Sequence, residues 1–141
     1  ARTHWTIYLT GMRVGREYEF VKYLADNTQA SLAVDIETFD KLTDLLASSC
    51  GYIGVDTFTS HLANALQIPG IVLFGPSDDR CWGPHPLHAS LKVVGSNQFA
   101  CRPCNLDGCG GGKRSDCLEA LDSAMVADSF INECESGKFF S

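Results

Sequence analysis

A short polar stretch behind an apolar run has the residue types to bind an anion. Asp56 ends the run, and hydroxyl side chains and a histidine follow it, at Thr57, Thr59, Ser60 and His61. Thr and Ser at such a place cap a helix, and the first backbone N–H groups of a helix, at the positive end of its dipole, bind phosphate. The pattern therefore predicts a phosphate-binding turn. Simple capping of the helix, with His61 packed on it, explains the same residues equally well.

Four of the seven cysteines gather in one segment and have the chemistry of a metal site. They are Cys101, Cys104, Cys109 and Cys117, with the spacing C-x2-C-x4-C-x7-C. The first pair lets two thiolates bind one ion from a single turn, and four thiolates suit zinc or a single iron. Glycines at 108 and 110–112 allow the backbone to bend toward the ion. Two disulfides, or reduced cysteines packed as small hydrophobic side chains, are the alternatives.

Strands and helices must place these residues, and the apolar pattern predicts both. We expect strands at 5–9, 32–34, 52–55, 71–74 and 91–94, and helices at 17–25, 40–47, 57–66 and 116–130. Phe20, Val21 and Leu24 would share the inward face of the first helix. Strands that alternate with helices predict an α/β fold, with a Rossmann-like parallel sheet covered on both faces. Ligands bind at the carboxyl ends of such strands, which is where Asp56 lies.

The composition is that of an acidic globular chain. It has 141 residues, of which 45% are hydrophobic and 20% are charged, and its formal net charge is −6. An acidic chain without clustered Lys and Arg is not expected to bind nucleic acid or anionic membranes. We expect a cytoplasmic protein that holds any anionic ligand with backbone amides or a few side chains. This setting favours a metal over disulfides at the cysteines.

A longer run around Asp56 resembles glycosyltransferase family 9, which contains the bacterial heptosyltransferases. The mark of that family is an Asp, a Ser or Thr, a Gly, two variable residues and His-Leu-Ala, then an Ala-Leu helix, a Pro and Phe-Gly-Pro. This chain has Asp56-Thr57, His61-Leu62-Ala63, Ala65-Leu66, Pro69 and Phe74-Gly75-Pro76. The similarity extends from Thr10-Gly11 to Cys117-Leu118. One position departs, because Phe58 stands where the family usually has glycine, which would let the backbone approach a phosphate closely.

The resemblance implies a binding site for a nucleotide-diphosphate sugar. Asp56 would order the turn, and Thr57 with the N–H groups of Phe58 and Thr59 would hold the diphosphate. His61, one turn into the helix, would face the same phosphates. Phe58 would either narrow the pocket or stack on a base or sugar.

An acidic residue at the start of the first helix is the second element of that site. Glu17 is similar in position to the family residue that binds the nucleotide ribose, and Glu19 is the second choice. A carboxylate that accepts hydrogen bonds from paired ribose hydroxyls is chemically sensible. A solvated Glu that is stabilised by the helix dipole explains Glu17 equally well.

The resemblance also implies the C-terminal, donor-binding half of a two-domain GT-B glycosyltransferase. Residues 1–95 would form the Rossmann-like nucleotide-sugar domain, with its first strand missing, and residues 96–141 the cysteine-rich metal knuckle and a helix. The N-terminal acceptor-binding domain of the same enzyme would supply the catalytic Asp, so we expect no catalytic residue in this chain and no turnover by it alone. The whole enzyme would invert the anomeric carbon while a base deprotonates the acceptor hydroxyl and the diphosphate departs.

The cysteine spacing narrows the resemblance further. Many family 9 sequences carry a similar Cys-x-Pro-Cys stretch followed by Cys-Leu, here Cys101 to Cys104 and Cys117-Leu118. The autotransporter heptosyltransferases are a subgroup whose resemblance implies an iron-bearing cysteine finger, with zinc as the alternative, and a homo-oligomer. It further implies ADP-heptose or a related ADP-sugar as donor, and a protein (autotransporter) or lipopolysaccharide acceptor.

Two other functions fit parts of the sequence. A metal-stabilised assembly module without catalysis needs the cysteines but not the turn at Asp56. A nucleotide-sugar epimerase of the 2-epimerase type shares the two-domain α/β architecture, but the His-Leu-Ala and Phe-Gly-Pro run fits family 9 better. Binding of an ADP-sugar that is lost on Asp56→Ala would favour the transferase over the assembly module.

Overall fold

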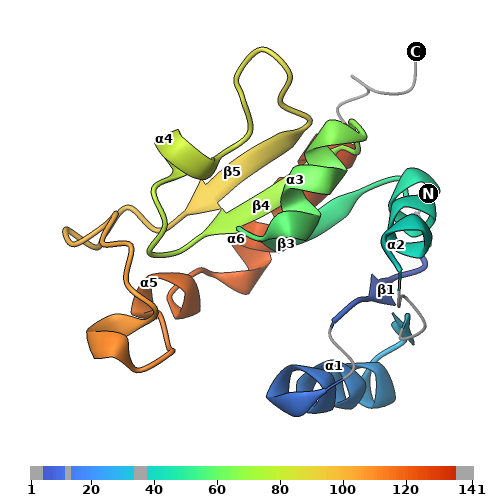
Figure 1. The fold of residues 1–141 in the computed structure, drawn as a ribbon, viewed down its shortest axis with the longest axis horizontal. Helices are drawn as coiled ribbons and strands as arrows, with labels where there is room; N and C mark the ends of the chain where they lie inside the picture. The colour runs from blue at the N-terminus through green and yellow to red at the C-terminus, as the bar shows by residue number, and fades with distance from the viewer. Residues whose placement is uncertain (1–4, 12–13, 34–37, 136–141) are drawn as a thin grey trace. The chain divides into compact units, whose positions relative to one another are not determined.

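The computed structural model describes residues 5–11, 14–33 and 38–135. The chain divides into two compact units, Ala1–Asp44 and Leu45–Ser141, and each has its own parallel sheet (Figure 1). This mixed α/β architecture with parallel sheets is consistent with the Rossmann-like fold that the sequence predicts. Within the described part of the chain, no helix is both long enough and apolar enough to cross a membrane.

The first unit contains a small β-α-β motif. β1 (Tyr8–Leu9) and β2 (Ser31–Leu32) are joined through α1 (Gly15–Asn27) and pair in parallel. β1 is shorter than the strand predicted at 5–9, because only two of its residues find partners on β2. The predicted end of β2, at Val34, lies outside the described residues. The next helix, α2 (Phe39–Ala47), crosses the division between the units.

The inward face of α1 differs from the prediction at one position. Val21 and Leu24 are half-buried as expected, but Phe20 keeps 61% of its surface exposed. All three residues fall within an arc of ~100° around the helix, as the periodicity requires, but Phe20, at one edge of that arc, stays uncovered among the described residues. The prediction that Phe20 belongs to this face is therefore wrong within the unit.

The centre of the second unit is β4 (Gly70–Phe74). It pairs in parallel with β3 (Tyr52–Val55) on one side and with β5 (Leu91–Gly95) on the other. α3 (Phe58–Ala65) packs on β3 in front of the sheet in Figure 1, and α6 (Ser123–Glu135) packs on β4 behind it. Strands covered on both faces read as continuous apolar runs. The β4 side chains that this cover buries almost completely are Ile71, Val72 and Phe74.

The C-terminal helix predicted at 116–130 is two helices. α5 (Asp116–Glu119) has its C-cap at Ala120, and α6 begins at Ser123. The reason is Asp122, whose carboxylate accepts a hydrogen bond from the Met125 amide at 2.8 Å, while its carbonyl accepts one from the Val126 amide. An Asp that satisfies the first amides of a helix favours a new helix start over continuation of the old one.

The cysteine segment, residues 101–118, packs against the sheet of the second unit. Arg102, whose side chain is only 10% exposed, donates from Nε to the Gly75 carbonyl and from Nη1 to the Ser96 carbonyl, both at 2.7 Å. The Asn105 amide donates to the Pro76 carbonyl at 2.9 Å. The segment is therefore bonded to the carboxyl ends of β4 and β5. The functional boundary between residues 95 and 96 stays a prediction.

Candidate functional site

The predicted anion-binding turn joins β3 to α3. Thr57, in an extended conformation, is the N-cap of α3. The Ser60 hydroxyl donates to the Thr57 carbonyl at 2.7 Å and accepts from the Thr57 amide at 3.4 Å. Ser60 is buried, and it fixes the first turn of the helix from inside. The Ser60 and His61 amides donate to the Thr57 carbonyl at 3.0 and 3.4 Å, and the positive end of the helix dipole favours an anion at this end of α3.

Asp56 and His61 form a pair beside this turn. The Nε2 atom of His61 lies 3.7 Å from Oδ1 of Asp56. The Asp56 side chain is 17% exposed, and the His61 side chain is 51% exposed. The imidazole is thus beside the carboxylate but still open to a ligand on its other side.

Tyr52 supports the turn from within β3, and the sequence analysis missed it. Its hydroxyl hydrogen-bonds with Thr57, and burial raises the pKa of this phenol to about 12, which the Thr57 bond opposes. The ring passes over Gly54, where a Cβ atom would lie 2.1 Å from the tyrosine oxygen. Alternate residues of a strand share one face. The spacing of Tyr52 and Gly54 is the one signal in the sequence that indicates this contact.

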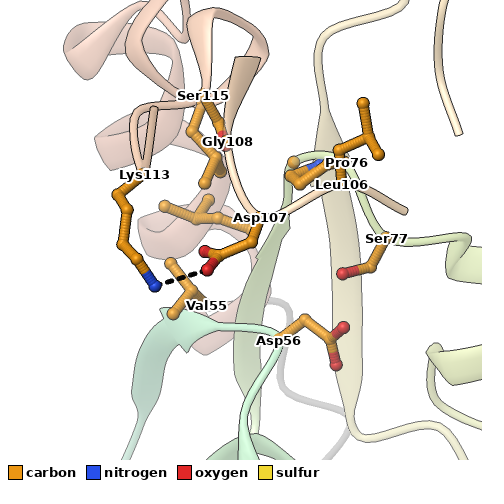
Figure 2. A pocket seen from close by; sticks show the side chains of 12 residues that line it. Val55, Asp56, Pro76, Ser77, Leu106, Asp107, Gly108, Lys113 and Ser115 are labelled. Carbon is orange, nitrogen blue, oxygen red and sulfur yellow. Dashed lines mark hydrogen bonds and ion pairs between the residues drawn. The ribbon is translucent and has the colours of Figure 1, made fainter. Parts of the chain in front are cut away.

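A cavity of about 280 Å³ opens at the carboxyl ends of β3 and β4 (Figure 2). The strand ends and the turn after β4 supply half of its lining: Val55, Asp56, Leu73, Gly75, Pro76 and Ser77. The cysteine segment supplies the other half: Leu106, Asp107, Gly108, Lys113, Ser115 and Leu118. The cavity thus lies where open α/β sheets bind ligands. Ser77 and the cysteine segment were not predicted to line this cavity, because they are far from Asp56 in the sequence.

The predicted site residues are distributed unevenly around this cavity. Asp56 lines it, whereas Thr57, Phe58, Thr59 and His61 continue from Asp56 into the first turns of α3. Phe58 does not line the cavity and keeps 58% of its surface exposed.

Glu17 belongs to the first unit. It lies in the first turn of α1, and its Oε1 atom is 3.2 Å from the position that a Cβ atom would take on Gly11. A side chain at Gly11 would therefore crowd the Glu17 carboxylate. Glu19 is exposed on the same helix.

The comparisons with known proteins give one result. The family model of "Glycosyltransferase family 9 (heptosyltransferase)" matches residues 1–113. The chain belongs to glycosyltransferase family 9. No curated protein and no solved structure matches it significantly. Glycosyltransferase activity is what this family implies, and the match includes Asp56, the α3 turn and three of the four clustered cysteines.

In this family 9 chain the clustered thiols do not form a finished metal site among the described residues. Cys117 is buried, and burial raises the pKa of its thiol. The charge of Arg102 lowers that pKa, and Cys109 and Cys104 raise it. The Asp116 amide donates to the Cys109 sulfur at 3.4 Å. Among the described residues, no three His, Cys, Asp or Glu side chains are arranged to hold a metal ion.

Glycines let this segment turn back on itself. Gly108, Gly110 and Gly111 have φ values of 84°, 61° and 76°, which L-residues rarely adopt. They let the chain turn through η1 (Cys109–Gly111) and return, so that the Cys109 amide donates to the Arg114 carbonyl at 2.6 Å.

Proposed function

We propose that this family 9 chain binds the donor of an inverting glycosyltransferase. The donor would be ADP-heptose or a related ADP-sugar, and the acceptor a protein (autotransporter) or lipopolysaccharide. The observation that carries the proposal is the cavity at the ends of β3 and β4, with Asp56 in its wall and the N-terminus of α3 directly behind Asp56. An anion at a helix N-terminus is stabilised by the amides and the helix dipole.

Each predicted residue has a role in this proposal. The Thr57 hydroxyl and the amides of Phe58 and Thr59 bind the diphosphate, and Asp56 orders the turn and orients His61 toward the same phosphates. As the sugar is transferred, negative charge grows on the departing diphosphate, and fixed donors stabilise that charge without reorganising. Glu17 binds the ribose of the nucleotide.

We assign the remaining chemistry to other parts of the enzyme. The base that deprotonates the acceptor hydroxyl belongs to the N-terminal acceptor-binding domain, so the chain alone binds the donor without turnover. We expect this reaction in the cytoplasm.

We further propose a structural metal, iron first and zinc second, held by Cys101, Cys104, Cys109 and Cys117. The donor set fits, because four thiolates suit either ion, although the thiols are not arranged around one point in this structure. The metal would cross-link the cysteine segment and support a homo-oligomer.

Isothermal titration calorimetry with ADP and ADP-heptose tests donor binding. We expect Asp56→Ala to weaken binding of both at least tenfold, because the turn loses its ordering carboxylate. Asp128→Ala, which removes an exposed carboxylate on α6, is the matched control and should change nothing. Equal affinities for the wild type and Asp56→Ala, or no binding by the wild type, would contradict the proposal.

Metal analysis by mass spectrometry, with a visible absorption spectrum, tests the cysteine site. About one iron per chain with thiolate-to-iron absorption, lost on combining Cys101→Ser with Cys104→Ser, is the expected result. Zinc at the same ratio would retain the site and remove the argument for the iron-bearing subgroup. Metal-dependent oligomers without nucleotide binding would instead favour the assembly module.

A further inference from the structure

One wall of the donor cavity carries a cation that the family motif does not contain. Among the described residues that line the cavity, Lys113 is the one Lys or Arg. It pairs with Asp107, its Nζ atom lying 2.5 Å from Oδ2. Figure 2 shows this pair beside Val55 on the left of the view, with Asp56 and Ser77 on the right. A ligand that fills the cavity from Asp56 toward the cysteine segment would reach Lys113.

The backbone of the cysteine segment holds this pair in place. The Lys113 amide donates to the Asp107 carbonyl at 3.2 Å, which closes the loop between the two residues. Gly108 makes the closure possible, since a Cβ atom there would lie 2.5 Å from the amide nitrogens of Lys113 and Arg114. The two charged side chains therefore leave the loop at its narrow base, next to the cavity.

The same loop is fixed to the sheet whose ends form the other wall. The Asn105 side chain accepts from the Asp78 amide at 3.2 Å, and the Asn105 amide donates to the Pro76 carbonyl. Leu118 packs against Gly75 so tightly that a Cβ atom there would lie 2.5 Å from Cγ of the leucine. Lys113 thus projects from a wall with a set position relative to Asp56.

The charges around the cavity favour a cation in the binding of a diphosphate. Asp56 and Asp107 both line it, and a diphosphate adds further negative charge. Arg102 lies nearby, but its donors are directed to the Gly75 and Ser96 carbonyls and toward Asp79. Lys113 is 80% exposed and Asp107 74% exposed, and pairs this exposed stabilise a protein little. The flexible side chain of Lys113 lets its ammonium group move from the Asp107 carboxylate to another anion at a small cost in free energy.

We propose that Lys113 leaves Asp107 and binds the diphosphate of the nucleotide-sugar donor, so that the cysteine segment is part of the donor site. This inference rests on the proposed function, because it needs a diphosphate in the cavity. Asp107 competes with the ligand for the ammonium in the free protein. Asp107 also raises the pKa of the Lys113 amine.

Calorimetric titration of the whole chain with ADP and with adenosine tests the proposal. Lys113→Met should weaken ADP binding about tenfold, whereas Lys113→Arg should keep most of it. Asp107→Asn should strengthen ADP binding several-fold, because it removes the competing carboxylate. Arg114→Met is the matched control: Arg114 is the neighbouring cation, pairs with Glu119 and does not line the cavity. Adenosine affinity should be the same in all variants.

The possible outcomes distinguish a failure of this inference from a failure of the proposed donor site. ADP binding by the wild type that Lys113→Met leaves unchanged overturns the role of Lys113 and leaves the donor site standing. An equal loss in Arg114→Met, or a loss of adenosine binding in Lys113→Met, also overturns it, because the effect would then be general charge or loop damage. No ADP binding by the wild type overturns both proposals. Far-UV circular dichroism and the melting temperature of each variant verify that it folds.

Discussion

Three residues around the α3 turn are joined by hydrogen bonds, and two of them have an obvious signal in the sequence. Thr57 is bonded to the Tyr52 hydroxyl on the strand side and to the Ser60 hydroxyl on the helix side. A hydroxyl residue at a helix start is a strong local pattern, so Thr57 and Ser60 were predictable. Tyr52 and Lys113 were not predicted, because Tyr52 reaches the turn from within a strand and Lys113 is far in the sequence from Asp56, with which it lines the cavity.

Replacement of Tyr52 by Phe tests this support at the residue scale. The lost hydrogen bond should lower the free energy of unfolding near neutral pH by roughly 0.5–1.5 kcal/mol. The pKa of Tyr52 is raised in the folded state to about 12, so the unfolded phenol, with an ordinary pKa of about 10, ionises first. The stability that Tyr52 contributes is therefore complete below about pH 10 and is lost as the pH rises toward about 12.

Urea unfolding at a series of pH values from about 8 to about 11.5 measures this effect. The wild type should lose its advantage over Tyr52→Phe as the pH rises. Parallel pH profiles for the two proteins would contradict the assignment. A spectrophotometric titration of the wild type should show a phenol with a pKa of about 12. This signal should be absent from Tyr52→Phe.

At the scale of elements, the contact between Gly75 and Leu118 joins the end of β4 to α5. Gly75 is buried, and Leu118 occupies the space of a missing side chain. Gly75→Ala should destabilise the protein by about 1–3 kcal/mol, because the added methyl group overpacks this contact. Thermal or urea unfolding measures the change.

The combination with Leu118→Ala is the control for that prediction. If the leucine is what the new methyl group meets, the double variant should be more stable than the sum of the single changes predicts, by about 0.5–3 kcal/mol. Strict additivity would show that Gly75→Ala acts through some other neighbour.

The division of the last helix gives a second prediction at this scale. Asp122→Ala removes the carboxylate that accepts from the Met125 amide and should cost about 1 kcal/mol of stability. Asp122→Asn, which retains an acceptor, should cost much less. Equal losses of stability in both variants would show that Asp122 does not act by capping α6.

Each helix or strand was predictable to the extent that its sequence signal is local. β3, β4 and β5 begin and end within one residue of the predicted positions, because each is an apolar run bounded by turn residues. The single helix predicted at 116–130 was wrong because an Asp inside an apolar periodic stretch caps a second helix, which periodicity does not detect. Phe20 was misplaced because periodicity predicts which residues share a helix face but not how much of that face other elements cover.

At the scale of the whole molecule, burial is concentrated in one unit. Every buried hydrophobic side chain among the described residues, from Leu46 to Cys134, lies in the second unit. We predict that a fragment of residues 38–141, which keeps α2 complete, unfolds cooperatively with a melting temperature close to that of the full chain. Circular dichroism of the two proteins tests this, and a fragment without a cooperative transition would contradict it.

The position of the cysteine segment has a consequence for regulation of the molecule. The cysteine segment carries the four clustered thiols, and its closed loop lines the donor cavity with Asp107 and Lys113. Under the two proposals made for it, metal and nucleotide become thermodynamically linked ligands of a single element. Linkage is reciprocal, so the factor by which the metal tightens ADP binding must equal the factor by which ADP tightens metal binding. Withdrawal of metal by a chelator would then be slowed or reversed by donor, and cellular metal supply would set how much of the protein is competent for sugar transfer.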